Sequence, residues 1–324
     1  MNFQKILDKV NKFYLKLLKK DKVSYPEIKE RVKVSSIQDK IDWGLQSTNI
    51  PEIWNKTMGD GIKICILDTG SPIKHKDLKN AVVKHADFTN SSYEDKQGHG
   101  THVSGIAAAR ANNRGIVGVA PLSELYIGKV LDDDGSGNLD WLVEGIKWAI
   151  EESVDIISIS LGSPSHYRPL KRIVEKAIDK NIIVIAAAGN EGKKRKNTVN
   201  YPGRYENVIT VGSYNEDLVR SNFSSCGPHL DLLGPGEDVL STWINNSYKT
   251  LDGTSMATPF IAGIAALALS KHRKQGGETE LKTQKQMRQH LLKMTVDKMS
   301  DRNDVKGYGI LDSENVVENF KNED

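Results

Sequence analysis

The chain has 324 residues, enough to bury the core of one large α/β domain or of two smaller domains. Its formal net charge of +3 is too small to indicate a nucleic-acid partner, and no apolar stretch approaches the length of a membrane span. Two distant cysteines, Cys65 and Cys226, and a lysine-rich N-terminus without a signal-peptide pattern predict a cytoplasmic protein with reduced thiols, or a secreted one if the chain is a processed form.

The N-terminal extension differs in pattern from the rest of the chain. Residues 1–20 carry apolar side chains at helical spacing with lysines between them, which predicts an amphipathic helix. Such a helix can pack on the protein's own body, which we favour, or lie on a membrane surface. Residues 21–40 are polar and predict a connecting segment. We therefore divide the chain into an extension over 1–40, a folded domain over 41–320 and a tail over 321–324, with the extension a candidate propeptide.

From residue 41 the pattern is α/β. Amphipathic segments at 139–152 and 169–180 predict helices. Short apolar runs that end in polar or glycine-rich turns predict strands at residues 62–70, 124–131, 154–162, 181–190 and 207–213. Continuous apolar strands alternating with helices indicate a parallel sheet covered on both faces, whose ligand site lies at the carboxyl ends of the strands.

Several polar residues stand at these predicted strand ends and at a helix start. Asp68 ends the first strand and could bind a metal, meet a cofactor ribose or begin a turn. Asn190 follows a strand and is by default a turn residue. His99 and His102 lie three residues apart in GHGTHVSG. A zinc pair is disfavoured there, because no carboxylate sits at a companion spacing and the pattern is not H-E-x-x-H.

The octapeptide GTSMATPF at 253–260 places Ser255 at the start of an apolar helix. Helix capping alone would account for a serine or threonine there. Small residues before a buried helix also present a nucleophile. Acyl transfer needs a hydroxyl, an imidazole, a carboxylate and an oxyanion donor. Ser255, His99, Asp68 and Asn190 provide one group of each kind, all from glycine-flanked segments.

Five motifs resemble the signature blocks of the subtilisin family of serine proteases: DTG at 68–70, HGTHVSG at 99–105, SLG at 160–162, AAGNEG at 187–192 and GTSMATP at 253–259. The similarity covers residues 41–320 and is greatest to the intracellular subtilisins. It implies a three-layer subtilisin-like α/β fold, with a mostly parallel central sheet and helices on both faces, and a serine endopeptidase acting on polypeptides through an acyl-enzyme.

The resemblance also implies a role for each catalytic group. Ser255 would be the nucleophile and His99 the general base, with Asp68 orienting the imidazole. The amide of Asn190 and the backbone N–H of Ser255 would bind the oxyanion. His102 would be structural.

Substrate-binding residues follow from the same resemblance. An extended peptide would pair with two backbone edges, formed by Gly135, Ser136 and Gly137 and by Ser160, Leu161 and Gly162. The second edge, with Ala187, Ala188 and Gly189, would line the first specificity pocket. Asn200 replaces a glycine common in the family and is expected to shrink or polarise that pocket. The acidic run 132–134 either forms a solvated loop or favours basic residues in the substrate.

A Ca²⁺ site is implied by Asp77 and the loop 110–116. Asp77 and Asn112 would supply side-chain oxygens, and Arg110, Arg114 and Ile116 would supply carbonyls, which suits a hard cation. Asp39 or Gln38 would be the N-terminal ligand. The two arginine side chains would have to point away from the ion.

The sequence is compatible with several functions. We favour a broad-range endopeptidase, and a dedicated processing protease for a peptide precursor is the alternative within the same class. A non-catalytic binding module would usually have lost a catalytic residue, and a nucleotide-binding protein would need a G-x-G-x-x-G after a strand. The oligomeric state is open, with a homodimer one option. The extension lacks the short inhibitory motif of intracellular subtilisins, yet we expect residues 21–40 to pass near the cleft and lower activity until they are cut.

Overall fold

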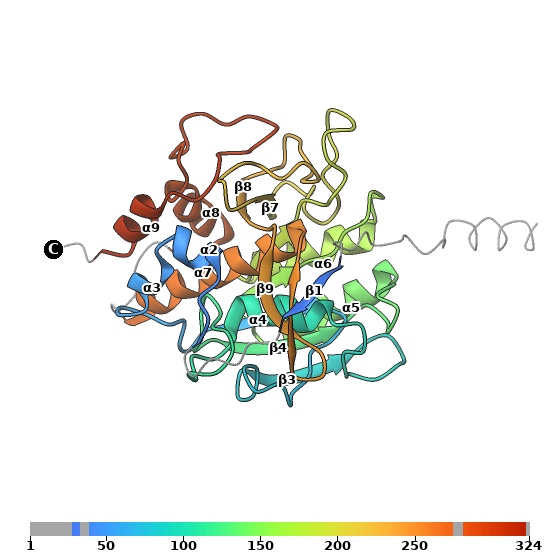
Figure 1. Cartoon of the computed structure of the whole chain (residues 1–324). Helices are drawn as coiled ribbons and strands as arrows, with labels where there is room; N and C mark the ends of the chain where they lie inside the picture. The colour runs from blue at the N-terminus through green and yellow to red at the C-terminus, as the bar shows by residue number, and fades with distance from the viewer. Residues whose placement is uncertain (1–27, 33–38, 275–280, 322–324) are drawn as a thin grey trace, which may run out of the picture.

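The computed structural model describes residues 28–32, 39–274 and 281–321 (Figure 1). The amphipathic helix predicted for residues 1–20 lies outside these ranges. Within them, seven parallel strands form a central sheet in the order β3-β4-β2-β5-β6-β7-β8. In chain order the strands are β2 (Lys63–Asp68), β3 (Val82–Asp87), β4 (Glu124–Lys129), β5 (Ile156–Ile159), β6 (Ile183–Ala187), β7 (Ile209–Tyr214) and β8 (Leu232–Pro235).

Each face of the sheet is covered by helices, which explains the continuous apolar strands. Ile64 and Ile66 of β2 belong to the core cluster beneath α4 (His99–Ala108) and α7 (Thr254–Lys274). Cys65 and Leu67, on the opposite face, belong to the cluster beneath α5 (Leu139–Glu151) and α6 (Arg168–Asp179). Successive residues of a strand point to opposite faces, so both sets must be apolar. The predicted three-layer α/β fold is confirmed.

A smaller antiparallel sheet has the order β1-β10-β9. Its hairpin consists of β9 (Val239–Trp243) and β10 (Ser247–Leu251), and β1 (Ile28–Val32) pairs with β10. The sequence predicted only a connecting segment around β1, because a five-residue run with three charged residues has no strand periodicity. The pairing of Ile28 with Leu251 brings the extension to the strand that leads into α7.

The remaining helices are short. They are α2 (Trp43–Ser47), α3 (Ile50–Ile53), α8 (Gln284–Lys293) and α9 (Ser313–Asn319). Helix α8 begins with a capping box, in which Thr283 and Gln286 satisfy each other's backbone N–H groups. Helices α8 and α9 pack together beside α3 and α7 (Figure 1). Among the helices in the described part of the chain, none combines the length and apolarity needed to cross a membrane.

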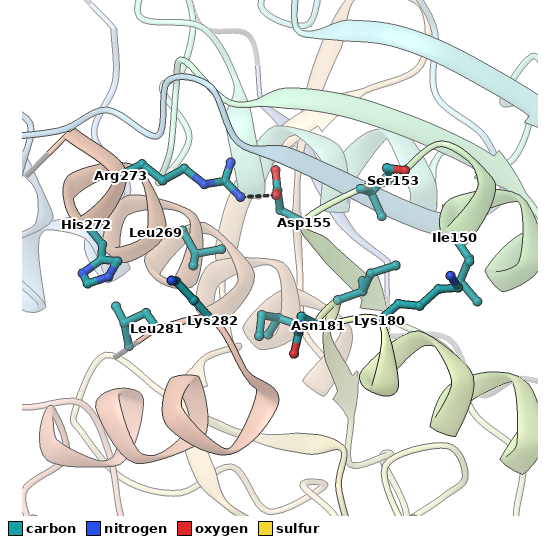
Figure 2. Close-up of a pocket in the computed structure, with 13 residues that line it drawn as sticks. Ile150, Ser153, Asp155, Lys180, Asn181, Leu269, His272, Arg273, Leu281 and Lys282 are labelled. Carbon is teal, nitrogen blue, oxygen red and sulfur yellow. Dashed lines mark hydrogen bonds and ion pairs between the residues drawn. The ribbon is translucent and has the colours of Figure 1, made fainter. Parts of the chain in front are cut away.

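The two ends of the central sheet differ in chemistry. At the amino-terminal ends of β5 and β6 lies a hollow of about 580 Å³, where Arg273 turns toward Asp155 and forms an ion pair (Figure 2). Lys180 and Arg273 lie at the C-terminal ends of α6 and α7, where positive charge complements the helix dipole. The carboxyl ends of the strands, on the opposite side, carry Asp68, Ser160 and the turn that follows β6. In parallel sheets of this kind the ligand site lies at these carboxyl ends.

Candidate active site

Asp68 and His99 form a buried pair at the carboxyl edge of the sheet. Asp68 is the last residue of β2 and His99 is the first of α4, and their side chains are 0% and 3% exposed. Asp68 Oδ1 lies 2.8 Å from His99 Nδ1 and also accepts the N–H of Thr69. A carboxylate at Nδ1 favours a proton on that nitrogen and leaves the lone pair of the imidazole on Nε2. The pair is thus arranged for Nε2 to accept a proton.

Two residues that the sequence did not single out hold this pair in place. The buried carboxylate of Asp95 accepts hydrogen bonds from the N–H groups of Gly98 and Thr101 and from the hydroxyl of Thr69. Thr69 Oγ1 in turn accepts the N–H of Gly100 at 2.8 Å. These bonds join the end of β2 to the first turn of α4. Burial raises the pKa of Asp95, and the hydrogen bonds oppose this.

Ser255 lies in the first turn of α7 and is 5% exposed. Its Oγ donates to the carbonyl of Ser160 at 2.9 Å, and Ser160 Oγ donates to the carbonyl of Ser255 at 2.9 Å. Pro259, four residues further along α7, has no N–H to offer that carbonyl. The hydroxyl of Ser160 replaces the missing helical bond and ties the end of β5 to the helix. The proline in the octapeptide therefore has a local structural role.

The amide of Asn190 is oriented by Thr254. Asn190 Oδ1 accepts the backbone N–H of Thr254 at 3.1 Å and its hydroxyl at 3.0 Å. Thr254 Oγ1 also accepts the N–H of Gly189 at 3.1 Å. Because Oδ1 is engaged by two donors, Nδ2 is the end of the amide that can donate to a bound group. The sequence suggested Thr254 only as a helix cap, because the partner of its hydroxyl comes from the turn after β6, 64 residues away.

A cavity of about 20 Å³ lies beside these residues. It is lined by Ser160, Leu161, Gly162, Ala187, Gly189, Asn190, Asn200, Thr254 and Ser255. Ala188 does not line it: the carbonyl of Ala188 accepts the N–H of Asn200, and its own N–H donates to Val211. Asn200 fills the floor, since a Cβ on Gly162 would lie 2.9 Å from its Cβ and a Cβ on Gly189 would lie 2.6 Å from its Nδ2.

The turn before Gly135, Ser136 and Gly137 is shaped by Asp132. Its Oδ1 accepts the N–H groups of Asp134 and Ser136, at 3.1 Å and 2.8 Å, and its own N–H donates to the carbonyl of Ser136. Gly135 has φ 75°, in the left-handed region that favours glycine. The three residues predicted as a substrate edge therefore sit on an ordered turn, and they do not line the small cavity.

The loop 110–116 packs around the carboxylate of Asp77. Oδ2 of Asp77 accepts the N–H of Ile116 at 3.1 Å and the hydroxyl of Tyr248 at 2.6 Å. Oδ1 lies 3.3 Å from Asn112 Nδ2, and the buried Oδ1 of Asn112 has no hydrogen-bond partner among the described residues. This unpartnered oxygen beside a carboxylate fits a hard cation.

The side chain of Arg110 and the carboxylate of Asp39 have partners other than Asp77. The guanidinium of Arg110 points away from the loop, donating to the carbonyls of Pro121 and Asn80. Asp39 accepts the N–H groups of Asn113 and Arg114, which closes the loop, and Gln38 lies outside the described residues. The part of the chain that the structure describes has no group of three or more His, Cys, Asp or Glu side chains that could hold a metal. A site made chiefly of carbonyl and amide oxygens would not form such a group.

Comparison with known proteins agrees with this fold. The model of the subtilase family matches residues 59–310. The "Intracellular serine protease" of Paenibacillus polymyxa is 41% identical over 297 residues, which cover 89% of each chain. The "Major intracellular serine protease" of Bacillus subtilis (strain 168) is 44% identical over 237 residues, 70% of this chain and 74% of that protein. Subtilisin E of the same organism is 42% identical over 264 residues, 80% of this chain and 68% of the relative.

These matches define the class of protein. The chain belongs to the subtilase family. It is a serine endopeptidase of the subtilisin type, as the motifs predicted.

Proposed function

We propose that the protein hydrolyses peptide bonds with Ser255 as nucleophile, His99 as general base and Asp68 as the group that orients His99. The observation that carries this assignment is the buried contact of 2.8 Å between Asp68 and His99, at the same sheet edge as Ser255. Ser255 Oγ bonds to the carbonyl of Ser160 in the free protein, so it must rotate to give its proton to His99 Nε2. Catalytic hydrogen bonds often form only when substrate is bound.

The reaction then has two halves. Ser255 Oγ attacks the scissile carbonyl as His99 takes its proton, and the oxyanion accepts from Asn190 Nδ2 and the N–H of Ser255. His99 then gives the proton to the leaving amine, and the C–N bond breaks to leave an acyl-enzyme. Water, deprotonated by His99, attacks the ester, and the acid product leaves as Ser255 regains its proton. Thr254 supports both halves by holding Asn190.

The same site supports a proposal for the substrate. An extended peptide would add as a strand to the backbone edges at 135–137 and 160–162. Asn200 fills the floor of the cavity beside Ser255, which favours a small or polar side chain before the scissile bond. Hydrolysis of a peptide library should then peak at Ala, Ser or Thr in that position. Asn200→Gly should shift the preference toward large apolar residues, and an unchanged preference would contradict the role of Asn200.

We further propose that Ca²⁺ binds at Asp77, Asn112 and the carbonyls of Arg110, Arg114 and Ile116. The unpartnered Oδ1 of Asn112 supports this donor set. A bound cation would supply structural stabilisation by fixing the loop beside α4.

We also propose that the protein acts inside the cell and that the extension restrains it. Two relatives carry the word intracellular in their names. Strand β1 pairs with β10, whose last residue, Leu251, comes four positions before Ser255. Deleting residues 1–36 should raise the initial rate and remove any lag. Equal rates, together with tight binding of the full chain to anionic vesicles, would instead favour a membrane-surface role for the amphipathic helix predicted over residues 1–20.

The proposed activity is tested with casein and a fluorophosphonate. Intact mass is measured before and after incubation of the purified protein beside Ser255→Ala, which reports self-cleavage and labelling together. We expect the wild type to degrade casein broadly and to gain one label. Cleavage confined to a single precursor would favour a dedicated processing protease, and no cleavage of any polypeptide would favour a binding module.

A further inference from the structure

Three segments around the proposed site meet at one carboxylate, that of Asp133. Lys96 Nζ lies 2.8 Å from Asp133 Oδ2, and Lys129 Nζ lies 3.2 Å from Asp133 Oδ1. Lys96 belongs to the loop that leads into α4 and His99. Asp133 itself belongs to the turn that carries residues 135–137.

Lys129 connects Asp133 to the end of β2. It is the last residue of β4, pairs in register with Asp68 of β2 and is 0% exposed. Its ammonium donates to the carbonyl of Thr69 at 2.7 Å, the residue after Asp68. A buried ammonium is strongly unfavourable without partners of this kind. Asp133 is the only carboxylate that the structure places within an ion-pair distance of Lys129 among the described residues, so the turn is drawn toward the end of β2.

This arrangement changes the interpretation of the acidic run 132–134. The carboxylate of Asp132 is bound to backbone N–H groups of its own turn, and that of Asp133 is bound to two lysines. The hydrogen bond from Lys96 lowers the pKa of Asp133, so its carboxylate stays charged near neutral pH. The charge of Asp133 is therefore paired with two lysines of the protein itself, and it is not available to bind a basic residue of a substrate.

We infer that Asp133 is a positioning residue, which holds the outer substrate edge at 135–137 in place against the strand end and loop that carry Asp68 and His99. This inference rests on the proposed function, because it assumes that a peptide pairs with that edge. An extended peptide needs the edge and the nucleophile at a fixed separation, since strand addition depends on several hydrogen bonds in register. A short ester that reaches only Ser255 does not need the edge.

The test uses Asp133→Asn, which keeps the shape of the side chain and removes its charge. Asp134→Asn is the matched control, because Asp134 is the exposed neighbour in the same turn. Both are assayed with a tetrapeptide anilide and with a short acetyl ester, after titration of active sites with a fluorophosphonate. We expect Asp133→Asn to lose roughly tenfold in kcat/KM on the peptide, mostly through KM, with the ester rate unchanged. The control should change neither rate by more than about twofold.

Two further variants keep the test informative if Asp133→Asn folds poorly. Lys96→Met, at an exposed side chain, should raise KM for the peptide in the same direction by a smaller factor. Asp133→Glu should restore part of the loss. In the wild type, 1 M NaCl should raise KM for the peptide, and in Asp133→Asn this effect should be reduced, because salt screens the Lys96 contact.

The outcomes separate this inference from the proposed function. Equal losses on peptide and ester, no loss on the peptide, or the same loss in Asp134→Asn would overturn the positioning role and leave catalysis by Ser255 intact. Failure of the wild-type protein to label at Ser255 and to hydrolyse the ester would overturn both.

Discussion

Polar side chains are arranged differently at the carboxyl edge of the sheet and in the loop 110–116. At the edge, Asn190 and His99 are each held by a neighbour through one side-chain atom, which fixes the chemical role of the other. Thr254 donates to Oδ1 of Asn190, so Nδ2 is the donor end of the amide, and Asp68 contacts Nδ1 of His99, so Nε2 is the basic nitrogen of the imidazole. Such preorganisation lowers the cost of reaching a transition state.

In the loop, the polar groups mostly satisfy one another. Asp77 accepts from Ile116 and Tyr248, and Asp39 accepts from two backbone N–H groups. Only the side-chain oxygen of Asn112 is buried without a partner in this part of the described structure. The edge is therefore arranged for reaction, whereas a cation in the loop would add stability to a shape that already exists.

The largest expected effect belongs to the edge. Ser255→Ala and His99→Ala should each lower kcat for peptide hydrolysis by a factor of roughly 10⁶. This factor is the one established for subtilisin and is not calculated from the present geometry. Initial rates on a peptide anilide measure the loss. Ser270→Ala is the matched control, because Ser270 is also a buried serine of α7 but bonds to the carbonyl of Asp60.

The control variant should keep its rate within about twofold. Activity of Ser255→Ala close to that of the wild type would contradict the assignment. So would a comparable loss of activity in Ser270→Ala.

The next effect tests preorganisation itself. Asn190→Ala should lower kcat by roughly 10²–10³ with little change in KM, because the oxyanion exists only after attack. Thr254→Val keeps the backbone donor to Asn190 and removes the hydroxyl donor, so it should lower kcat by about tenfold. Steady-state kinetics on one substrate measure both.

The effect of Thr254→Val on kcat and on KM shows which step the hydroxyl serves. A Thr254→Val variant that changes KM alone would show that this hydroxyl serves substrate binding and not the oxyanion donor. Thr254→Ser, which keeps the hydroxyl, should recover most of the rate.

A smaller effect is expected in the loop. Calcium at about 100 times its dissociation constant should stabilise the fold by about 2.7 kcal/mol, because only the native state binds it. Thermal unfolding with calcium and with chelator measures the shift. In Asn112→Ala the shift should be reduced, with peptidase activity at room temperature retained.

The calcium experiment needs one check on the starting material. If the metal content of the purified protein is zero and the melting temperature does not respond to calcium, the loop holds no cation. The comparison between edge and loop would then rest on protein contacts alone.

The smallest effect concerns His102, which shares α4 with His99 and is fully buried. Its Nε2 lies 2.9 Å from the carbonyl of Lys249, and burial lowers its pKa to about 3. Between pH 6.5 and 3 the imidazole of His102 binds a proton in the unfolded chain but not in the native state. The free energy of unfolding therefore falls as the pH falls through this range. Lowering the pH from 6.5 to 5 should therefore reduce the free energy of unfolding by about 2 kcal/mol through His102.

Chemical denaturation at the two pH values measures that slope. His102→Gln keeps a donor for the carbonyl of Lys249 and does not titrate, so it should lose less stability than the wild type over the same range. Identical slopes would show that His102 is not the acid-sensitive group.

Much of the fold could be predicted from the sequence because the sheet is buried on both faces. Strands such as β2 and β6 are continuous apolar runs, and amphipathic helices lie between several of them, so their existence and approximate bounds were clear. The edge strand β3 (VVKHAD) is mixed in character, and the pairing of β1 with β10 depends on contacts far apart in sequence. Neither leaves a local periodicity to read.

The site could be predicted only in part for a similar reason. Asp68, His99, Asn190 and Ser255 carry reactive groups in recognisable motifs. The groups that position them, Thr69, Asp95 and Thr254, use ordinary turn and cap residue types whose partners lie on other segments. Lys129 is a charged residue at the end of an apolar strand, which is unusual. Nothing in the strand's own sequence identifies Thr69 and Asp133 as its partners.

The central claim, that the carboxyl edge is preorganised around one nucleophile, is tested most directly by covalent labelling. Wild-type protein and His99→Ala are treated with a fluorophosphonate, and the labelled peptide is identified by mass spectrometry. The account predicts one label, on Ser255, that forms rapidly in the wild type and is almost absent in His99→Ala. A label on another residue, or equal labelling of Ser255 without His99, would contradict it.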